Sequence, residues 1–530
     1  MRRSLVILAA LAGLLTTLIP ATHADTQPWA SMERGFITSF DGTPIVYNLF
    51  LPPGATATSP APVIMRTHGW GGSGETTFSA SSTGAKLLNA GYAVLTWDER
   101  GFGQSGGDAW IDHPDYEVKD AEALIDKILV PRPEILKSDA AQTDPVIGMT
   151  GGSYAGGIQL ALSAFDHRVD AIAPEITWND LNRSLWQGDV IKLGWGELLY
   201  GSGLATATTS GLSPSGTAGI QTGSYSPIIH ESEVTGAALG YPTAQSKANF
   251  SPQGLKTYGV DHPVSVPTLL IQGKTDTLFD LNEAWANYQA VKATGAPVKL
   301  LAYCDGHAGC VPGYKDNATS RSEADAAILT WFAKYLKGDT TADTGSAVHY
   351  SLKDGTWHDA DTFPTLADPG AATFTDARGS GTVVNPGNAN PGAGGSIGPV
   401  VTDASTLGEP GTMNVNVLPA SPADRQIVGI GHVRGTISGV GPGTNLIFKL
   451  VDRTDNQVID FQAATLRVDG PFLLPADVQT FSVDLVGVAE LLPAGHPLDL
   501  EVSTTGLAHT TYRGAGQFTV NLTHIRVPVL

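Results

Sequence analysis

The chain has 530 residues, of which 42% are hydrophobic and 15% charged, and its formal net charge at pH 7 is −20. This composition excludes a disordered, collagen-like or coiled-coil chain, and the length predicts two or three globular domains. The acidic charge repels nucleic acid and anionic lipid, so neither is expected as a partner.

The N-terminal segment has the order of a secretory signal peptide. Arg2 and Arg3 precede an apolar stretch, and Thr22-His23-Ala24 offers a small-residue cleavage site. An uncleaved membrane anchor is the alternative, although Pro20 and the short apolar run argue against a full span. We therefore expect residues 1–24 to be removed, and the mature protein to be secreted and free of the membrane.

Strand and helix patterns alternate in the segment that follows. The runs PVIMRTHG, YAVLTWDERG and DPVIGMT are predicted to be buried strands, and DYEVKDAEALIDKIL places its apolar residues on one helical face. After an interruption the alternation resumes with PTLLIQG, VKLLAYC and a helix that ends near Leu336. Residues 25–340 are therefore predicted to form an α/β domain with a doubly wound, mostly parallel sheet that is covered on both faces.

The interruption covers residues 176 to about 262 and is rich in Trp, Gly, Ser and Thr. We interpret it as a cap that helps to shape a pocket, with Trp178 and Trp186 among the lining residues. The alternative is that these aromatic side chains only pack the insertion against the sheet.

Beyond residue 340 the sequence has short alternating runs such as NLIFKLVD, FSVDLVGV and LDLEVSTT, separated by Gly, Pro, Asp and Asn. This pattern predicts a β-sandwich over residues 341–530. The stretch from Asp368 to Val400 is rich in Gly, Asn, Pro and Ala and is predicted to be a long loop.

The run GMTGGSYAGG places Ser153 where a predicted strand gives way to a helix. A nucleophile elbow requires this context, because a sharp turn exposes the serine hydroxyl and needs small neighbours. The match to G-x-S-x-G is incomplete, since Ala155 stands where the second glycine is expected. A flexible polar turn is the competing interpretation.

Two residues downstream fit the partners of an activated serine. A serine hydroxyl needs an imidazole to take its proton and a carboxylate to orient that imidazole, in the chain order serine, acid, histidine. Asp276 and His307 each follow a predicted strand, so both should project from the same sheet edge as Ser153. Asp305 and Asp280 are rival acids, but the first shares the histidine loop and the second lies toward the next helix.

Acyl transfer also needs hydrogen-bond donors for the developing oxyanion. We expect the backbone N–H of Tyr154 to be one donor and the N–H of Trp70, in the loop HGWGGSG, to be the other. Cys304 and Cys310 bracket His307 and are expected to form a disulfide, because a metal site would need more ligands than they and one histidine supply. No metal and no cofactor is predicted.

The stretch GGSYAGG resembles the G-x-S-Y-x-G signature of the X-prolyl dipeptidyl-peptidase and cocaine-esterase family of α/β-hydrolases. The passage KYLKGDTT to HYSLKDGTWHDADTFP is similar to that family's junction between domains. The resemblance implies a mainly helical cap, a C-terminal jelly-roll domain, and Ser153, Asp276 and His307 as nucleophile, acid and base. Members often carry Arg-x-Pro-Tyr after the early strand, whereas this chain has Arg66-Thr67-His68-Gly69-Trp70, which favours a backbone oxyanion donor.

These features predict a secreted serine hydrolase that forms an acyl-enzyme with an ester or peptide substrate. An X-prolyl dipeptidyl-peptidase is favoured and a carboxylic-ester hydrolase of the cocaine-esterase type is the alternative. Dipeptidyl-peptidase activity would require carboxylates to hold a substrate ammonium, and the sequence does not choose among Asp180, Asp189, Glu197, Glu231 and Glu233. A hypothesis of another class is a surface-binding protein whose β domain grips carbohydrate or cell wall. Neither the oligomeric state nor the leaving group follows from the sequence.

Overall fold

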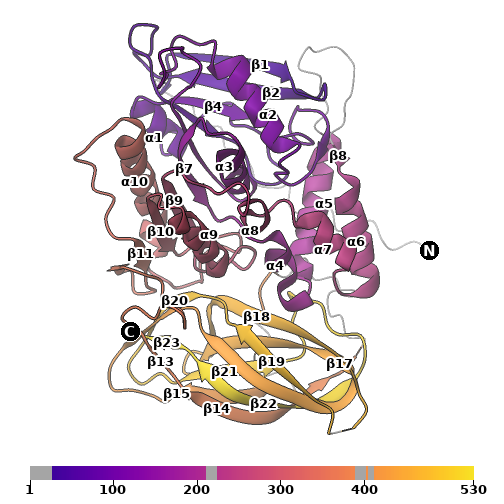
Figure 1. Ribbon diagram of the computed structural model, residues 1–530. Coiled ribbons are helices and arrows are strands. Elements are labelled where there is room, and N and C mark those ends of the chain that lie inside the picture. The colour runs from indigo at the N-terminus through magenta and orange to yellow at the C-terminus, as the bar shows by residue number, and fades with distance from the viewer. Residues whose placement is uncertain (1–26, 210–223, 388–400, 404–406, 408–410, 475) are drawn as a thin grey trace, which may run out of the picture.

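The computed structural model describes residues 27–209, 224–387, 401–403, 407, 411–474 and 476–530. The predicted signal peptide lies outside the described residues. The described residues form an α/β domain, a helical cap and a β-sandwich (Figure 1). No helix among the described residues is long and apolar enough to cross a bilayer.

A ten-stranded sheet forms the α/β domain, in the order β1-β2-β4-β3-β6-β7-β9-β10-β11-β12. Its central strands, from β4 to β11, run parallel, and β1, β2 and β12 are antiparallel at the two edges. Central strands such as β4 and β9 are buried along their whole length, which explains their continuous apolar sequences. The strand bounds are β1 Ser31–Thr38, β2 Pro44–Leu51, β3 Val63–Arg66, β4 Ala93–Trp97, β6 Ile147–Gly152, β7 Val169–Glu175, β9 Thr268–Gly273, β10 Val298–Tyr303, β11 Val348–Ser351 and β12 Trp357–Ala360.

Helices cover both faces of this sheet, as the strand and helix alternation predicts. Apolar residues of α2, α3 and α9 pack on one face, and those of α1 and α10 pack on the other. The bounds are α1 Thr83–Asn89, α2 Glu117–Leu124 with its π-helical extension η1 Ile125–Leu129, α3 Tyr154–Phe165, α9 Leu281–Ala293 and α10 Asn317–Leu336. The predicted α/β fold is therefore confirmed.

The cap lies between β7 and β9 and is mainly helical within the described residues. It consists of α4 Leu181–Trp186, η2 Gln187–Asp189, α5 Leu193–Thr209, β8 Ser224–Tyr225, α6 Pro227–Leu239, α7 Ala244–Phe250 and α8 Leu255–Tyr258. The short strand β8 pairs with β5, Asp108–Ala109, and so ties the cap to the α/β domain. In Figure 1, α5 and α6 stand beside the sheet and reach toward the sandwich.

The C-terminal domain is a β-sandwich built around one apolar core. The long strand β17 pairs with β19 and β22 along its first half and with β18 and β21 along its second half, so it belongs to both layers. The strand bounds are β13 Thr373–Phe374, β14 Ala377–Asn385, β15 Met413–Leu418, β16 Arg425–Gly429, β17 His432–Asp452, β18 Gln457–Phe472, β19 Val478–Asp484, β20 Val488–Leu492, β21 Leu498–Ser503, β22 Gly516–Arg526 and β23 Pro528–Val529.

The structure corrects two details of the domain organisation. The predicted boundary at residue 340 comes too early, because β11 and β12 extend the hydrolase sheet. Short alternating runs look alike in both domains, and only the pairing partner separates them. The predicted loop from Asp368 to Val400 contains β13 and β14 within its described part, and residues 388–400 lie outside it. Its small residues have a packing role, because a Cβ at Gly379 would approach Val415 to 2.5 Å.

A buried lysine joins the α/β domain to the sandwich. Lys274, which directly follows β9, is fully buried and pairs with Asp316 at 2.9 Å. Its Nζ also donates to the carbonyl oxygens of Ser351 at 3.0 Å and of Ala489, in the sandwich, at 3.1 Å. A buried charge must be paired to be stable, so this lysine fixes how the two domains meet.

Replacing Lys274 tests this role. Lys274→Met leaves Asp316 as a buried charge without its partner, and we expect a loss of about 3–5 kcal/mol in the free energy of unfolding. The double variant Lys274→Met/Asp316→Leu should recover part of that loss. Urea unfolding measures both, with Lys119→Ala as the control, because the partly exposed pair Lys119–Glu122 is worth only about 0.5 kcal/mol. A Lys274→Met protein as stable as this control would contradict the assignment.

Candidate active site

Ser153 lies in a strained turn between β6 and α3. Its backbone has φ 60° and ψ −123°, a conformation that residues other than glycine rarely adopt. The Ser153 N–H donates to the carbonyl oxygen of Glu175 at 3.0 Å, which anchors the turn to β7. Small residues are required after it, because a Cβ at Gly157 would lie 2.5 Å from the ring of Trp178. The turn therefore has the geometry of a nucleophile elbow.

His307 faces this hydroxyl from the loop after β10. Its Nε2 is 2.7 Å from Ser153 Oγ, and its Nδ1 is 2.6 Å from Asp276 Oδ2. The ring is held edge-on by Trp195, with centroids 5.7 Å apart, and by Phe279, with centroids 5.2 Å apart. The three residues that the sequence predicts to converge are therefore joined in one hydrogen-bonded chain.

The carboxylate of Asp276 is fully buried and held from several sides. Oδ1 accepts the N–H groups of Leu278 at 2.9 Å and Phe279 at 3.1 Å, and Oδ2 also accepts the N–H of His307 at 3.2 Å. These bonds leave the carboxylate one orientation, with Oδ2 directed at the imidazole. Of the rival acids, Asp305 accepts the N–H of Gly306, and Asp280 pairs with Arg183 at 3.0 Å.

The loop that carries the histidine is closed by the predicted disulfide between Cys304 and Cys310. The disulfide packs against Val311 and Tyr314 in a small apolar cluster. The cysteines are therefore not available as metal ligands. A second group with ligand-like spacing, Asp452, Asp455 and His496, lies in the sandwich and is joined by its own hydrogen bond between Asp452 and His496 at 2.7 Å.

Two backbone N–H groups fit the predicted oxyanion donors. The N–H groups of Trp70 and Tyr154 donate to no other group within the described part of the chain. Gly69, next to Trp70, lies close enough to Ser153 that a Cβ on it would be 3.9 Å from the serine Cβ. His68 has another use, because its Nε2 accepts the N–H of Glu99 at 3.0 Å, and burial lowers the pKa of the imidazole.

A cavity of about 240 Å³ opens at Ser153. Trp178 and Trp186 line it, as predicted, and most other lining residues are apolar and come from the cap, including Leu181, Leu185, Ile229 and Phe250. The sandwich contributes Thr510 and Arg513, and no pattern in the sequence predicts either residue at this site. The Arg513 guanidinium donates to the carbonyl oxygen of Ala237 at 2.8 Å and so holds the C-terminal end of α6.

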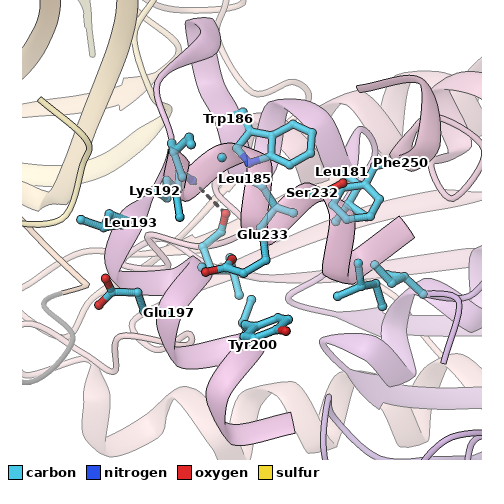
Figure 2. Close-up of a pocket in the computed structure, with 18 of the residues that line it drawn as sticks. Leu181, Leu185, Trp186, Lys192, Leu193, Glu197, Tyr200, Ser232, Glu233 and Phe250 are labelled. Carbon is cyan, nitrogen blue, oxygen red and sulfur yellow. Dashed lines mark hydrogen bonds between the residues drawn. The ribbon is translucent and has the colours of Figure 1, made fainter. Parts of the chain in front are cut away.

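Two of the five candidate carboxylates line this cavity, Glu197 on α5 and Glu233 on α6 (Figure 2). Burial, together with the nearby charge of Glu197, raises the pKa of Glu233. Within the described ranges neither carboxylate forms an ion pair with a cationic side chain. The others are engaged outside the cavity: Asp180 pairs with Lys256, Asp189 pairs with Lys247, and Glu231 accepts from Asn249.

A buried acidic group lies behind the serine turn. The Tyr154 hydroxyl donates to Glu117 Oε1 at 3.1 Å, and Glu117 also accepts the N–H of Trp110 at 2.6 Å. Glu99 and Asp112 are buried beside it, and burial raises the pKa of both carboxyls well above the ordinary range. Burial raises the pKa of Glu117 to about 7. No feature of the sequence predicts this group, because its members come from four separate places: the loop after β4, the segment before α2, α2 itself and the start of α3.

A protein-family model described as X-Pro dipeptidyl-peptidase (S15 family) matches residues 41–309, more than half of the chain. The chain belongs to this family. The resemblance in the serine stretch is thereby confirmed, and this S15 family chain is an α/β-hydrolase. Among curated protein sequences, none matches it significantly.

Solved structures share the whole fold of this S15 family member. An aminopeptidase from a marine sediment Thaumarchaeota archaeon matches with a TM-score of 0.68 at 15% identity, covering 98% of this chain and 99% of that one. A CocE/NonD family hydrolase from Staphylococcus aureus matches with a TM-score of 0.65 at 15% identity, covering 94% and 93%. An alpha-amino acid ester hydrolase also matches with a TM-score of 0.65 at 15% identity, covering 99% of both chains. At this identity the likeness establishes the fold.

The raised pKa of Glu117 predicts a pH-dependent stability. The unfolded chain ionises this carboxyl near pH 4.5, whereas the folded protein holds the proton up to about pH 7. The protonated Glu117 carboxyl therefore makes its full contribution to the free energy of unfolding below pH 4.5. This contribution, at most about 3 kcal/mol, is lost as the pH rises through 7.

Glu117→Gln removes this titration while keeping the size of the side chain. We expect the stability of Glu117→Gln relative to wild type to increase between pH 5 and 8, as measured by urea unfolding at each pH. Glu122→Gln, on the same helix but partly exposed, is the control and should run parallel to wild type. Parallel curves for Glu117→Gln as well would show that the folded protein does not retain the proton.

Proposed function

We propose that this protein is a secreted serine hydrolase that cleaves peptides or esters through an acyl-enzyme, with X-prolyl dipeptidyl-peptidase-like specificity. The observation that carries the proposal is the chain Ser153 Oγ to His307 Nε2 at 2.7 Å and His307 Nδ1 to Asp276 at 2.6 Å, at the base of a cavity. His307 takes the serine proton as Ser153 Oγ attacks the substrate carbonyl, and Asp276 stabilises the imidazolium. The backbone N–H groups of Tyr154 and Trp70 stabilise the oxyanion.

Hydrolysis of the acyl-enzyme uses the same residues a second time. After the leaving group has taken the proton from His307, the imidazole removes a proton from water, which attacks the acyl carbonyl. The imidazolium then returns this proton to Ser153 Oγ as the bond between the acyl carbon and Oγ breaks. The predicted N-terminal signal peptide supports export, and the Cys304–Cys310 disulfide is compatible with an oxidising compartment. We propose a peptide or ester as the only substrate class, with no nucleic acid or membrane partner.

The polar composition of the cavity favours a substrate with a free amino group. Glu197 and Glu233 bring negative charge into a space lined mainly by apolar side chains, and its two cationic lining residues, Lys192 and Arg513, donate to backbone carbonyl oxygens. In such surroundings the electrostatic attraction between an ammonium group and the two carboxylates is stronger than it would be in water. The aromatic wall formed by Trp178, Trp186 and Phe250 fits a proline ring or another apolar group beside it. The same wall fits an aryl or alkyl ester, so an esterase of the cocaine-esterase type is the second candidate.

A substrate panel on the purified protein separates these possibilities. It compares Xaa-Pro anilides, free N-terminal dipeptide amides, N-blocked peptides and short-chain aryl esters. Hydrolysis of Xaa-Pro anilides, but not of their N-blocked versions, supports the dipeptidyl-peptidase specificity. Hydrolysis of esters alone supports the esterase, and a protein that turns over none of them supports a binding function for the β domain.

Ser153→Ala tests the nucleophile. The wild-type protein should react covalently with a fluorophosphonate probe, and Ser153→Ala should not react at all. Hydrolysis of the best panel substrate should fall by at least about 1000-fold, because the remaining site retains only substrate binding and the oxyanion donors. Fluorescence of the labelled band in a gel measures the first effect. Persistent labelling of Ser153→Ala would place the reactive hydroxyl elsewhere.

Glu233→Gln tests the ammonium site. For substrates with a free amino group we expect kcat/KM to fall by about 10- to 100-fold, the value of one hydrogen bond between charged groups. For aryl esters kcat/KM should stay within about 2-fold, because these substrates carry no ammonium. Glu231→Gln, on the same helix but exposed, is the matched control. An equal loss of kcat/KM for both substrate classes would show that Glu233 maintains the shape of the cavity and does not bind the ammonium group.

A further inference from the structure

Strand β18 of the sandwich has an irregular segment that points at the α/β domain. Asp460 and Phe461 have φ values of 49° and 63°, in the left-handed region that residues other than glycine rarely occupy. The register between β17 and β18 shifts at the opposite position, between Lys449 and Val451. Such a bulge re-aims the side chains next to it, and the strain of two left-handed residues must be offset by contacts they make possible.

The residue that follows the strained pair, Gln462, reaches the turn that carries Asp276. Its Nε2 donates to the carbonyl oxygen of Lys274 at 2.8 Å and to that of Asp276 at 3.0 Å. The Gln462 side chain is buried, so neither of these bonds competes with water. Both ends of the turn between β9 and the acid are therefore held by one carboxamide from another domain.

The other two bulge residues contact the surroundings of the same turn. The Phe461 side chain packs against the cluster that contains the Cys304–Cys310 disulfide, which closes the His307 loop. The Asp460 carboxylate accepts the N–H of Ala489 at 2.9 Å, and Ala489 O in turn accepts from Lys274. The bulge thus lies against both loops that supply the acid and the imidazole.

We propose that Gln462 is a positioning residue, through which the sandwich domain sets the orientation of Asp276 toward His307. This inference rests on the proposed function of the triad. Oδ1 of Asp276 accepts its hydrogen bonds from N–H groups of its own turn, whereas Oδ2 bonds to His307, so a rotation of that turn would move Oδ2 away from the imidazole. Gln462 is not one of the residues that line the cavity, so its effect should be on the chemical step and not on substrate binding.

A second carboxamide supplies a matched control for domain docking. Asn282 on α9 donates to the carbonyl oxygen of Leu485 at 3.0 Å and accepts the N–H of Gly487 at 2.6 Å. It therefore also makes two hydrogen bonds between the α/β domain and the sandwich. These bonds do not involve the turns that carry Asp276 and His307. Asn282→Leu removes interdomain contact without releasing the acid.

The experiment compares Gln462→Met, Gln462→Glu and Asn282→Leu with wild type, using the best substrate of the panel and urea unfolding. We expect Gln462→Met to lower kcat by roughly 10- to 100-fold with KM within about 2-fold, as small misplacements of catalytic groups do. Asn282→Leu should lower the unfolding midpoint to a similar extent while kcat stays within about 2-fold. A kcat for Gln462→Met equal to that of Asn282→Leu would overturn the proposal.

Gln462→Glu provides an independent readout that does not depend on comparing stabilities. The ionised carboxylate cannot donate to the two carbonyl oxygens, whereas the protonated carboxyl can donate to one. We expect kcat of Gln462→Glu, divided by that of wild type at each pH, to rise as the pH falls. A ratio that is constant with pH would contradict a role for the donated hydrogen bonds.

The outcomes also separate this inference from the proposed function. If the wild-type protein reacts with no fluorophosphonate and cleaves no panel substrate, the proposed function is wrong. If the wild-type protein does both and Gln462→Met is fully active, only the proposed role of Gln462 is wrong.

Discussion

The structure depends on the short turn from Lys274 to Asp276, where two buried charges lie two residues apart. The ammonium of Lys274 is paired with Asp316 and holds backbone carbonyls of both domains, and the carboxylate of Asp276 is paired with His307. A buried charge is stable only when it is paired and hydrogen-bonded, so neither side chain can move alone. The contact between domains and the geometry of the triad are therefore determined by the same few atoms.

The nucleophile is held by a different device. Ser153 occupies a strained backbone conformation that persists because Glu175 accepts its N–H and because the glycines after it allow close packing of the cap. The imidazole makes edge-on contacts with two aromatic rings and lies in a loop closed by a disulfide. Each member of the triad is thus fixed by its own surroundings, which limits rearrangement when a substrate binds.

Chemistry and specificity are carried by different parts of the chain. The triad comes entirely from loops at the carboxyl edge of the hydrolase sheet, whereas most of the cavity wall and both of its carboxylates come from the cap. The sandwich touches each part separately, through Gln462 at the acid turn and Arg513 at the end of α6. Changes in the cap can therefore alter which substrates fit while the reacting groups stay in place.

The sequence by itself determined the alternation of strands and helices, the order of Ser153, Asp276 and His307 along the chain, and the pairing of Cys304 with Cys310. These features depend on local periodicity and short spacing, which a single sequence displays. The assignment of β11 and β12 to the hydrolase sheet, and the choice of Glu197 and Glu233 from the five candidate carboxylates, were decided only by the tertiary structure. The contacts made by Glu117, Gln462 and Arg513 were likewise decided only by the tertiary structure. Such contacts join residues up to hundreds of positions apart. The local sequence around one partner does not indicate which distant residue it will contact.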